Sequence, residues 1–269
     1  MKIGNHLFDL ETKSYIMGIL NVTPDSFSDG GKYQSLELAV AQARRMVEEG
    51  ATIIDIGGES TRPGHEKISD EEEIRRVVPV IEAVKKELDV AISLDTYKYA
   101  VAEAGIAAGA DMINDIWGLK WDERLAPLIA RTGVACCLMH NRQNAEYNDF
   151  LQGFREDMEE TVAIAKNAGI AEDKIMLDPG VGFGKTYEHN LIVMNHLELM
   201  KKFNYPFLLG TSRKSMIGNA LDLPVDQRVE GTVATTVMGR MKGASVFRVH
   251  DVEENIRALQ MTDAILEVE

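Results

Sequence analysis

The chain has 269 residues, of which 45% are hydrophobic and 27% are charged, and its formal net charge is −14 at pH 7. Such a chain can bury a large core, and its negative charge disfavours nucleic acid and anionic membrane surfaces as partners. No apolar run approaches the length that spans a bilayer, and the first residues lack the apolar core of a signal peptide. We therefore expect a cytoplasmic protein with neither a nucleic-acid nor a membrane partner.

Strand-like runs alternate with helix-like runs along the chain. The runs rich in apolar and β-branched residues cover 15–21, 52–58, 90–96, 111–116, 134–140, 174–180, 206–212 and 245–251. Segments with helical periodicity or helix-favouring composition follow them at 35–50, 69–88, 97–109, 122–133, 151–169, 186–203, 227–243 and 252–268. Apolar strands that alternate with amphipathic helices predict a parallel sheet covered by helices.

Eight such units in a chain near the usual ~250 residues predict a (β/α)8 barrel, that is, a TIM barrel of the α/β class, with a doubly wound sheet as the alternative. The segment 2–10 precedes the first unit and is expected to form a short hairpin-like closure of the barrel bottom. We find no linker or low-complexity segment, so 1–269 is interpreted as one domain. Cys136 and Cys137 are adjacent in a strand, where side chains alternate faces, and are interpreted as buried thiols.

Polar residues follow almost every predicted strand, where the functional sites of such barrels lie. They are Asn21, the turn 57–62, Asp95, Asn114 with Asp115, His140, Asp178, residues 212–215, and Arg248 with His250. Any one of them could be a helix cap, but so many together indicate a site.

The residue types narrow the chemistry of that site. Asp95, Asn114 and Asp178 can accept hydrogen bonds from a donor-rich edge such as that of an aminopyrimidine. Arg248 and His250 are two residues apart on one strand, so both point to the same face, and with Arg62 they could hold a phosphate or pyrophosphate. Structural pairing or capping remains the alternative for each of them.

Two loops and one lysine complete the candidates. Lys214 could donate to a ring carbonyl, or could be a solvated loop lysine. The turn-rich loops TPDSFSDGG (23–31) and GGESTRPG (57–64) follow the first two strands. Phe27 in the first loop could pack on the barrel rim, or could cover an aromatic substrate as part of a lid.

The stretch DPGVGFGKT (178–186) resembles a phosphate-binding P-loop, but Pro179 occupies the place of the first glycine. Proline removes a backbone N–H where the phosphate cradle needs donors. Lys185 is therefore not expected to bind phosphate, and its truncation is expected to leave turnover largely intact.

A set of motifs, in this order and on these strands, resembles those of the dihydropteroate synthase family, the folate-pathway target of sulfonamides. The motifs are MGILNVTPDSFSDGG, GATIIDIGGESTRPG, SLDT, INDI, DPGVGFGKT, LLGTSRKS and RVHDV. The resemblance covers essentially the whole chain. It implies condensation of 6-hydroxymethyl-7,8-dihydropterin pyrophosphate with p-aminobenzoate to dihydropteroate and pyrophosphate, through a pterin cation.

The resemblance also implies a role for each matching residue. The pterin would contact Asp95, Asn114, Met139, Asp178, Phe183 and Lys214. The pyrophosphate would contact Asn21, Thr61, Arg62, Arg248 and His250, with Mg²⁺ bound partly through Asn21. The p-aminobenzoate would contact Phe27, Thr61, Arg62, Pro63, Phe183, Lys214 and Ser215. The catalytic set would be Asp95, Lys214, Arg248 and His250. Sulfonamides would inhibit, and the chain would form a homodimer through its late helices.

Three other functions remain open at this point: a pterin-binding methyltransferase barrel, a metal-dependent hydrolase barrel and a non-catalytic pterin-binding homologue. The first would not need the two turn-rich loops, and the second would favour an H-x-H motif where this chain has Leu20 and Asn21. The chain departs from many relatives at MHNRQN (139–144), where Asn141 and Arg142 are given no role. The packing of Trp117 and Trp121 is likewise left open.

Overall fold

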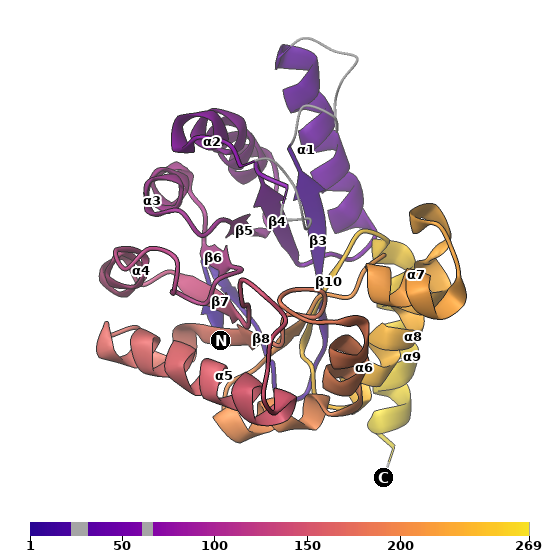
Figure 1. The fold of residues 1–269 in the computed structure, drawn as a ribbon. Coiled ribbons are helices and arrows are strands. Elements are labelled where there is room, and N and C mark those ends of the chain that lie inside the picture. Colours follow the sequence, from indigo (N-terminus) through magenta and orange to yellow (C-terminus); the bar gives the residue numbers. More distant parts are fainter. Residues whose placement is uncertain (23–31, 61–66, 269) are drawn as a thin grey trace.

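The computed structural model describes residues 1–22, 32–60 and 67–268. Its central feature is a sheet of eight parallel strands that curls into a barrel (Figure 1). The strands are β3 (Tyr15–Asn21), β4 (Ile53–Gly57), β5 (Ala91–Asp95), β6 (Met112–Asp115), β7 (Ala135–Met139), β8 (Ile175–Asp178), β9 (Leu208–Leu209) and β10 (Val246–Val249).

The strand order confirms the predicted TIM barrel. Neighbours in space follow the chain from β3 to β8, and β10 pairs with both β3 and β9. The backbone N–H of Leu177 donates to the carbonyl of Pro206 at 3.0 Å, which joins β8 to the segment leading into β9 and closes the ring. A doubly wound sheet would instead reverse its strand order at a switch point, so that alternative is excluded.

Helices surround the strands (Figure 1). They are α1 (Lys32–Glu48), α2 (Asp70–Glu87), α3 (Tyr99–Ala108), α4 (Leu125–Thr132), α5 (Phe150–Asn167), α6 (Tyr187–Asn195), α7 (Ser215–Leu221), α8 (Val229–Met241) and α9 (Val252–Leu266). Short 3₁₀ helices cover Glu172–Lys174, Leu197–Phe203 and Val225–Gln227. Within the described ranges, no helix is both long and apolar enough to cross a bilayer.

Two helical segments differ from the prediction. The helix expected at 186–203 ends as α6 at Asn195, and Leu197–Phe203 continues as a 3₁₀ helix after a break at His196. Residues 215–221, for which no element was predicted, form α7. Apolar spacing cannot separate an α-helix from a 3₁₀ continuation whose side chains are also buried, and α7 spans only about two turns.

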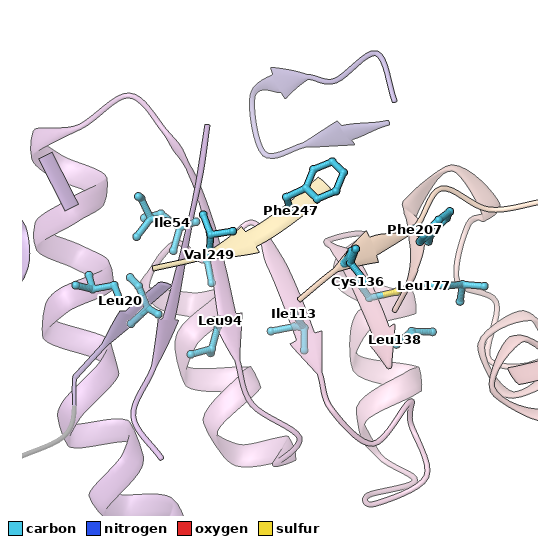
Figure 2. Packing of buried hydrophobic residues seen from close by; sticks show 14 of the residues in the cluster. Leu20, Ile54, Leu94, Ile113, Cys136, Leu138, Leu177, Phe207, Phe247 and Val249 are labelled. Atoms are coloured by element: carbon cyan, nitrogen blue, oxygen red, sulfur yellow. The ribbon is translucent and has the colours of Figure 1, made fainter. Parts of the chain in front are cut away.

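The strands bury apolar side chains on both faces. Figure 2 shows outward-facing residues such as Leu94, Leu138 and Val249, which belong to the core between the barrel and the helices. Cys136 lies in this outer core, whereas Cys137 lies in a second cluster inside the barrel. Both are buried free thiols, so the predicted alternation is confirmed.

The inner cluster fills the amino end of the barrel. It contains Met17, Ile53, Ala91, Met112, Ala135, Cys137, Met176, Leu208 and Val246. The antiparallel hairpin of β1 (Lys2–Ile3) and β2 (His6–Leu7) covers this end, because Ile3 and Phe8 are buried in the same cluster. The expected hairpin closure is confirmed, and polar inward-facing residues are left for the carboxyl end.

Candidate active site

The carboxyl ends of the strands bring the predicted polar residues to one rim. In the strand register, Asn21 is level with Gly57, and Gly57 is level with Asp95. Asp95 is in turn level with Asn114. On the opposite side, Met139 of β7 is level with Asp178 of β8. Residues from six strands therefore meet at the end where barrel enzymes place their chemistry.

Arg248 on β10 extends to two carboxylates inside the barrel. Its Nε donates to Asp55 Oδ2 at 2.6 Å, and its Nη2 donates to Asp95 Oδ2 at 2.7 Å. Burial alone would lower the pKa of Arg248, but Asp55 and Asp95 raise it above the usual value, so the guanidinium stays charged. The sequence predicts a cation group of Arg248 and His250 apart from Asp95, whereas the structure brings Arg248 and Asp95 into contact.

Asp55 is a site residue that the sequence analysis missed. It is fully buried on β4 and accepts a hydrogen bond from Asn114 Nδ2 at 3.2 Å in addition to the Arg248 bond. In the sequence, Asp55 is a single carboxylate within an apolar strand. It lies two residues before Gly57, so both positions are on the inward face of the strand. Carboxylates are almost never fully buried without a partner, so this position merited attention.

Two carboxylate oxygens in this cluster have no hydrogen-bond partner among the described residues. They are Asp55 Oδ1 and Asp95 Oδ1, and both are buried. Burial raises the pKa of Asp95 to about 7, against the opposing effect of Arg248. A buried acceptor without a partner costs about 1–3 kcal/mol, so these oxygens are suited to receive N–H groups of a ligand.

Asp178 and Lys214 form the facing part of the rim. Asp178 Oδ1 accepts from the backbone N–H of Gly180 at 2.7 Å. Lys214 Nζ donates to the carbonyl of Val181 and lies 4.6 Å from the centroid of the Phe183 ring. Burial lowers the pKa of Lys214 to about 8 and raises that of Asp178. Lys214 is therefore not a solvated loop lysine.

An apolar wall lies beside these polar groups. Met139, Tyr97 and Ile116 form a buried cluster against which Trp117 and Phe183 pack. The packing of the two tryptophans, left open by the sequence, is now clear: Trp121 lies 5.3 Å from Trp117 and 5.1 Å from Tyr97, measured between ring centroids. The wall suits one face of a flat aromatic ligand.

His250 is held by Ser212. The Ser212 Oγ accepts from the backbone N–H of His250 at 3.1 Å and lies 2.9 Å from its Nδ1. The serine hydroxyl proton can then point to Nδ1, which places the proton of a neutral ring on Nε2. Ser215 is exposed and begins α7 directly after Lys214.

Four other predicted contacts cannot be placed. Phe27, Thr61, Arg62 and Pro63 lie outside the described residues, and their roles stay predictions.

Two strand-end residues are structural. Asp115 accepts from the backbone N–H groups of Trp117 and Leu119 at 2.8 and 2.6 Å, so it caps a turn on the outer side of the barrel. His140 is buried between Asp157 and Lys185. Lys185 is thus anchored inside the fold and not at a phosphate cradle, and its contacts give it a role that the sequence did not predict. That truncation of Lys185 leaves turnover largely intact stays a prediction.

Asn21 is the predicted ligand of Mg²⁺ and offers one amide oxygen at the end of β3. The described part of the chain contains no group of three or more His, Cys, Asp or Glu side chains that could hold a metal ion. Mg²⁺ commonly keeps several waters and binds through one or two protein oxygens together with substrate phosphates. A single rim oxygen therefore fits an ion that arrives with a pyrophosphate, whereas the hydrolase alternative finds no ligand cluster in these residues.

Comparisons with known proteins agree with this geometry. The family described as pterin binding enzyme matches residues 17–250. Dihydropteroate synthase of Clostridium beijerinckii is 58% identical over 267 residues, which cover 99% of each chain. A crystal structure of dihydropteroate synthase from Clostridium difficile in the presence of pteroic acid has a TM-score of 0.95 at 49% identity, covering 97% of this chain and 100% of that one.

A crystal structure of Yersinia pestis dihydropteroate synthase with a sulfonamide drug has a TM-score of 0.93 at 43% identity, covering 100% of this chain and 99% of that one. These identities extend over nearly the full length of the relatives. The chain belongs to the dihydropteroate synthase family of pterin-binding enzymes.

Proposed function

We propose that the carboxyl end of the barrel binds 6-hydroxymethyl-7,8-dihydropterin pyrophosphate and p-aminobenzoate and condenses them to dihydropteroate and pyrophosphate. The observation that carries the proposal is the set of contacts at the rim, where the buried acceptors Asp95 and Asp178 face the cations Arg248 and Lys214. The relatives crystallised with pteroic acid and with a sulfonamide support it, because pteroic acid joins a pterin to p-aminobenzoate.

The pterin is assigned to the acceptors of the rim. Its amino and ring N–H groups would donate to Asp95, Asn114 and Asp178, and Lys214 would donate to an acceptor on the ring. The apolar faces of Met139 and Phe183 would border the ring plane. Hydrogen bonds to charged groups contribute about 1.5–3 kcal/mol each, which suits selective capture of a small polar heterocycle.

Bond breaking requires charge stabilisation at both ends of the substrate. The C9–O bond breaks with its electron pair leaving on pyrophosphate, and the carboxylate of Asp95 stabilises the resulting pterin cation. Arg248 uses two of its five N–H groups on Asp55 and Asp95, so further donors remain for the departing oxygens, next to His250. When bound, Mg²⁺ at Asn21 would neutralise pyrophosphate charge.

The amine of p-aminobenzoate then forms the new C9–N bond with its lone pair and releases its proton to water. A neutral aniline needs no strong general base at pH 7. Phe183, Lys214 and Ser215 are the assigned contacts of p-aminobenzoate within the described residues. The predicted contribution of Phe27, Thr61, Arg62 and Pro63 belongs to the same proposal.

The late helices support the proposed homodimer. Exposed large apolar side chains gather on α7, α8 and α9: Leu221, Met238, Met241, Met261, Ile265 and Leu266. Exposed apolar side chains on neighbouring helices are typical of an interface between subunits. Light scattering of the purified protein is expected to give twice the 29.8 kDa chain mass, and a monomer would contradict this part. The cytoplasmic location stays a prediction.

The reaction is tested by measuring pyrophosphate release with Mg²⁺, the pterin pyrophosphate and p-aminobenzoate, omitting each in turn and then adding a sulfonamide. We expect release that needs all three and that falls with the drug. Tight pterin binding without release under any combination would instead indicate a non-catalytic homologue or a methyltransferase.

A further inference from the structure

The turn between β8 and α6 carries two of the assigned pterin contacts, with Asp178 before it and Phe183 within it. Side chains from outside and inside the turn hold its backbone carbonyls. The bonds run from Lys185 to Gly180 and Phe183 at 2.9 and 3.0 Å, from Lys214 to Val181, from Tyr147 to Gly184 at 2.8 Å, and from Asn190 to Thr186 at 2.7 Å. The shape of the turn is thus set by donors that lie mostly outside it.

Lys185 is the central donor of this set. Its Nζ also lies 2.7 Å from Nδ1 of His140, so its three acceptors match the three N–H groups of the charged lysine. Burial lowers the pKa of Lys185 well below its usual value, whereas the charges of Asp178 and Asp157 favour the charged form. The Nε2 of His140 lies 2.9 Å from Asp157 Oδ2 on α5. Since Lys185 donates to Nδ1, the neutral ring carries its proton on Nε2 and donates it to Asp157.

The protonation states of His140 and Asp157 agree with that direction of hydrogen bonding. Burial and the neighbouring Lys185 lower the pKa of His140 to about 3, so its ring is neutral at physiological pH. Burial opposes ionisation of Asp157, but bonds from His140 and Arg142 hold its pKa below the usual range. Arg142 Nε donates to Asp157 Oδ2 at 2.6 Å, which gives this residue of the unusual MHNR segment a structural role.

The turn is in close contact with that segment. Gly180, Gly182 and Gly184 have φ of 67°, 88° and 53°, conformations that other residues rarely adopt. A Cβ on Gly180 would lie 1.9 Å from the carbonyl oxygen of His140, and one on Gly184 would lie 2.6 Å from the backbone nitrogen of Arg142. A turn in such a conformation needs bonds from its surroundings to keep one arrangement.

We propose that Lys185, His140 and Asp157 form a positioning relay, which fixes the turn so that Asp178 and Phe183 meet the pterin in one geometry. Replacing a buried charged group by an apolar side chain of similar volume is often neutral for stability, so we assign the enclosed lysine to fixing the arrangement of the turn. The inference rests on the proposed function for the identity of the ligand. It adds three positioning residues that do not touch the substrate.

The test compares Lys185→Met with Lys86→Met, a matched change at an exposed position on α2. Binding of 6-hydroxymethylpterin is measured by calorimetry, KM for p-aminobenzoate by pyrophosphate release, and the thermal midpoint by calorimetry. For Lys185→Met we expect about tenfold weaker pterin binding and a thermal midpoint close to that of Lys86→Met. The p-aminobenzoate KM is expected to rise by less than the loss in pterin binding, because only Phe183 of the two positioned residues is also assigned to p-aminobenzoate.

A second pair of variants keeps the proposal testable if Lys185→Met fails to fold. Asp157→Leu removes the acceptor of His140 and is expected to weaken pterin binding severalfold. Asp157→Asn retains an oxygen acceptor and is expected to recover most of that loss.

Pterin binding unchanged in both Lys185→Met and Asp157→Leu would overturn the relay, as would parallel losses of stability and of affinity for both substrates. If the unmodified protein does not bind pterin, the proposed function fails and the relay fails with it. If it binds pterin and the variants match it, only the relay fails.

Discussion

Arg248 Nη2 lies 2.7 Å from Asp95 Oδ2, so a cation from β10 and a carboxylate from β5 form an ion pair inside the barrel. Through its Nε, the same guanidinium also binds Asp55. One planar guanidinium therefore orients two carboxylates, and the Oδ1 atoms of both are buried without a hydrogen-bond partner among the described residues. Arg248, which is assigned to the pyrophosphate, therefore also orients Asp95, which is assigned to the pterin cation.

Replacing Arg248 by lysine is predicted to lower kcat/KM by about 100-fold or more. A lysine keeps the charge but cannot present two N–H groups in a rigid fork to both carboxylates. Steady-state kinetics of Arg248→Lys check this, with Arg257→Lys on the exposed side of α9 as the control. Equal kcat/KM in the two variants would mean that the fork geometry does not matter.

The second prediction concerns the residue that sequence reasoning missed. Asp55→Asn is expected to raise the pterin KM about tenfold, because the bonds that orient Arg248 and Asn114 both involve this carboxylate. It is also expected to move the acid limb of activity to lower pH, since Asp55 is one of the charges that raise the pKa of Asp95. Asp89→Asn, at a fully exposed side chain, should change neither quantity.

The pH dependence of kcat/KM follows from two shifted groups. Asp95 must be ionised, which occurs above its pKa of about 7, and Lys214 must be protonated, which holds below its pKa of about 8. We therefore expect a bell-shaped profile with its maximum between these values. Lys214→Arg should remove the alkaline limb while leaving the acid limb in place, and a profile flat from pH 6 to 9 would contradict both assignments.

The raised pKa of Asp95 also makes the free energy of unfolding depend on pH. Its pKa in the folded state lies above the unfolded value of 3.8, so the folded state holds the proton more tightly. The contribution of Asp95 to the free energy of unfolding therefore falls as pH rises from about 4 to about 7. Urea unfolding across this range should show a smaller decline in Asp95→Asn than in the unmodified protein.

A fifth prediction separates the two ends of the barrel. The hairpin of β1 and β2 forms a plug at the amino end of the barrel. Ile3 in this plug is fully buried, whereas Leu7 in the same hairpin is 82% exposed. Ile3→Ala should lower the free energy of unfolding by about 2–4 kcal/mol, and Leu7→Ala should change it by less than about 0.5 kcal/mol. Both should leave the pterin KM unchanged, since the plug lies away from the strand ends that form the site. A rise in KM for Ile3→Ala would show that the plug also shapes the site.

The barrel could be predicted because its evidence is local. Each strand is an apolar run, each helix has its own periodicity, and eight repetitions leave few arrangements. The break at His196 and the short α7 were not predicted. Apolar spacing does not show where an α-helix changes to a 3₁₀ helix, and a helix of two turns is too short to give a clear periodicity. Element boundaries depend on tertiary contacts more than on the residues themselves.

The sequence predicted those site residues that lie at the ends of strands, but not the deeper ones. Asp178 and Asn114 stand where any barrel would display them, but Asp55 lies one inward position deeper and looks like an interruption of a strand. The relay joins Lys185 of one strand–helix unit to His140 and Asp157 of the unit before it, and no motif spacing in the sequence indicates these contacts. Long-range pairing of charges is the information that the linear pattern lacks.

The central claim is that this barrel joins a pterin to p-aminobenzoate, and the most direct test follows both products in one reaction. Dihydropteroate and pyrophosphate are quantified by mass spectrometry from the same time points, with the unmodified protein and with Asp178→Asn. We predict that the two products appear in equal amounts, and that Asp178→Asn needs a markedly higher pterin concentration to form either. Pyrophosphate formed without dihydropteroate, or in equal amounts with and without p-aminobenzoate, would contradict the synthase reaction.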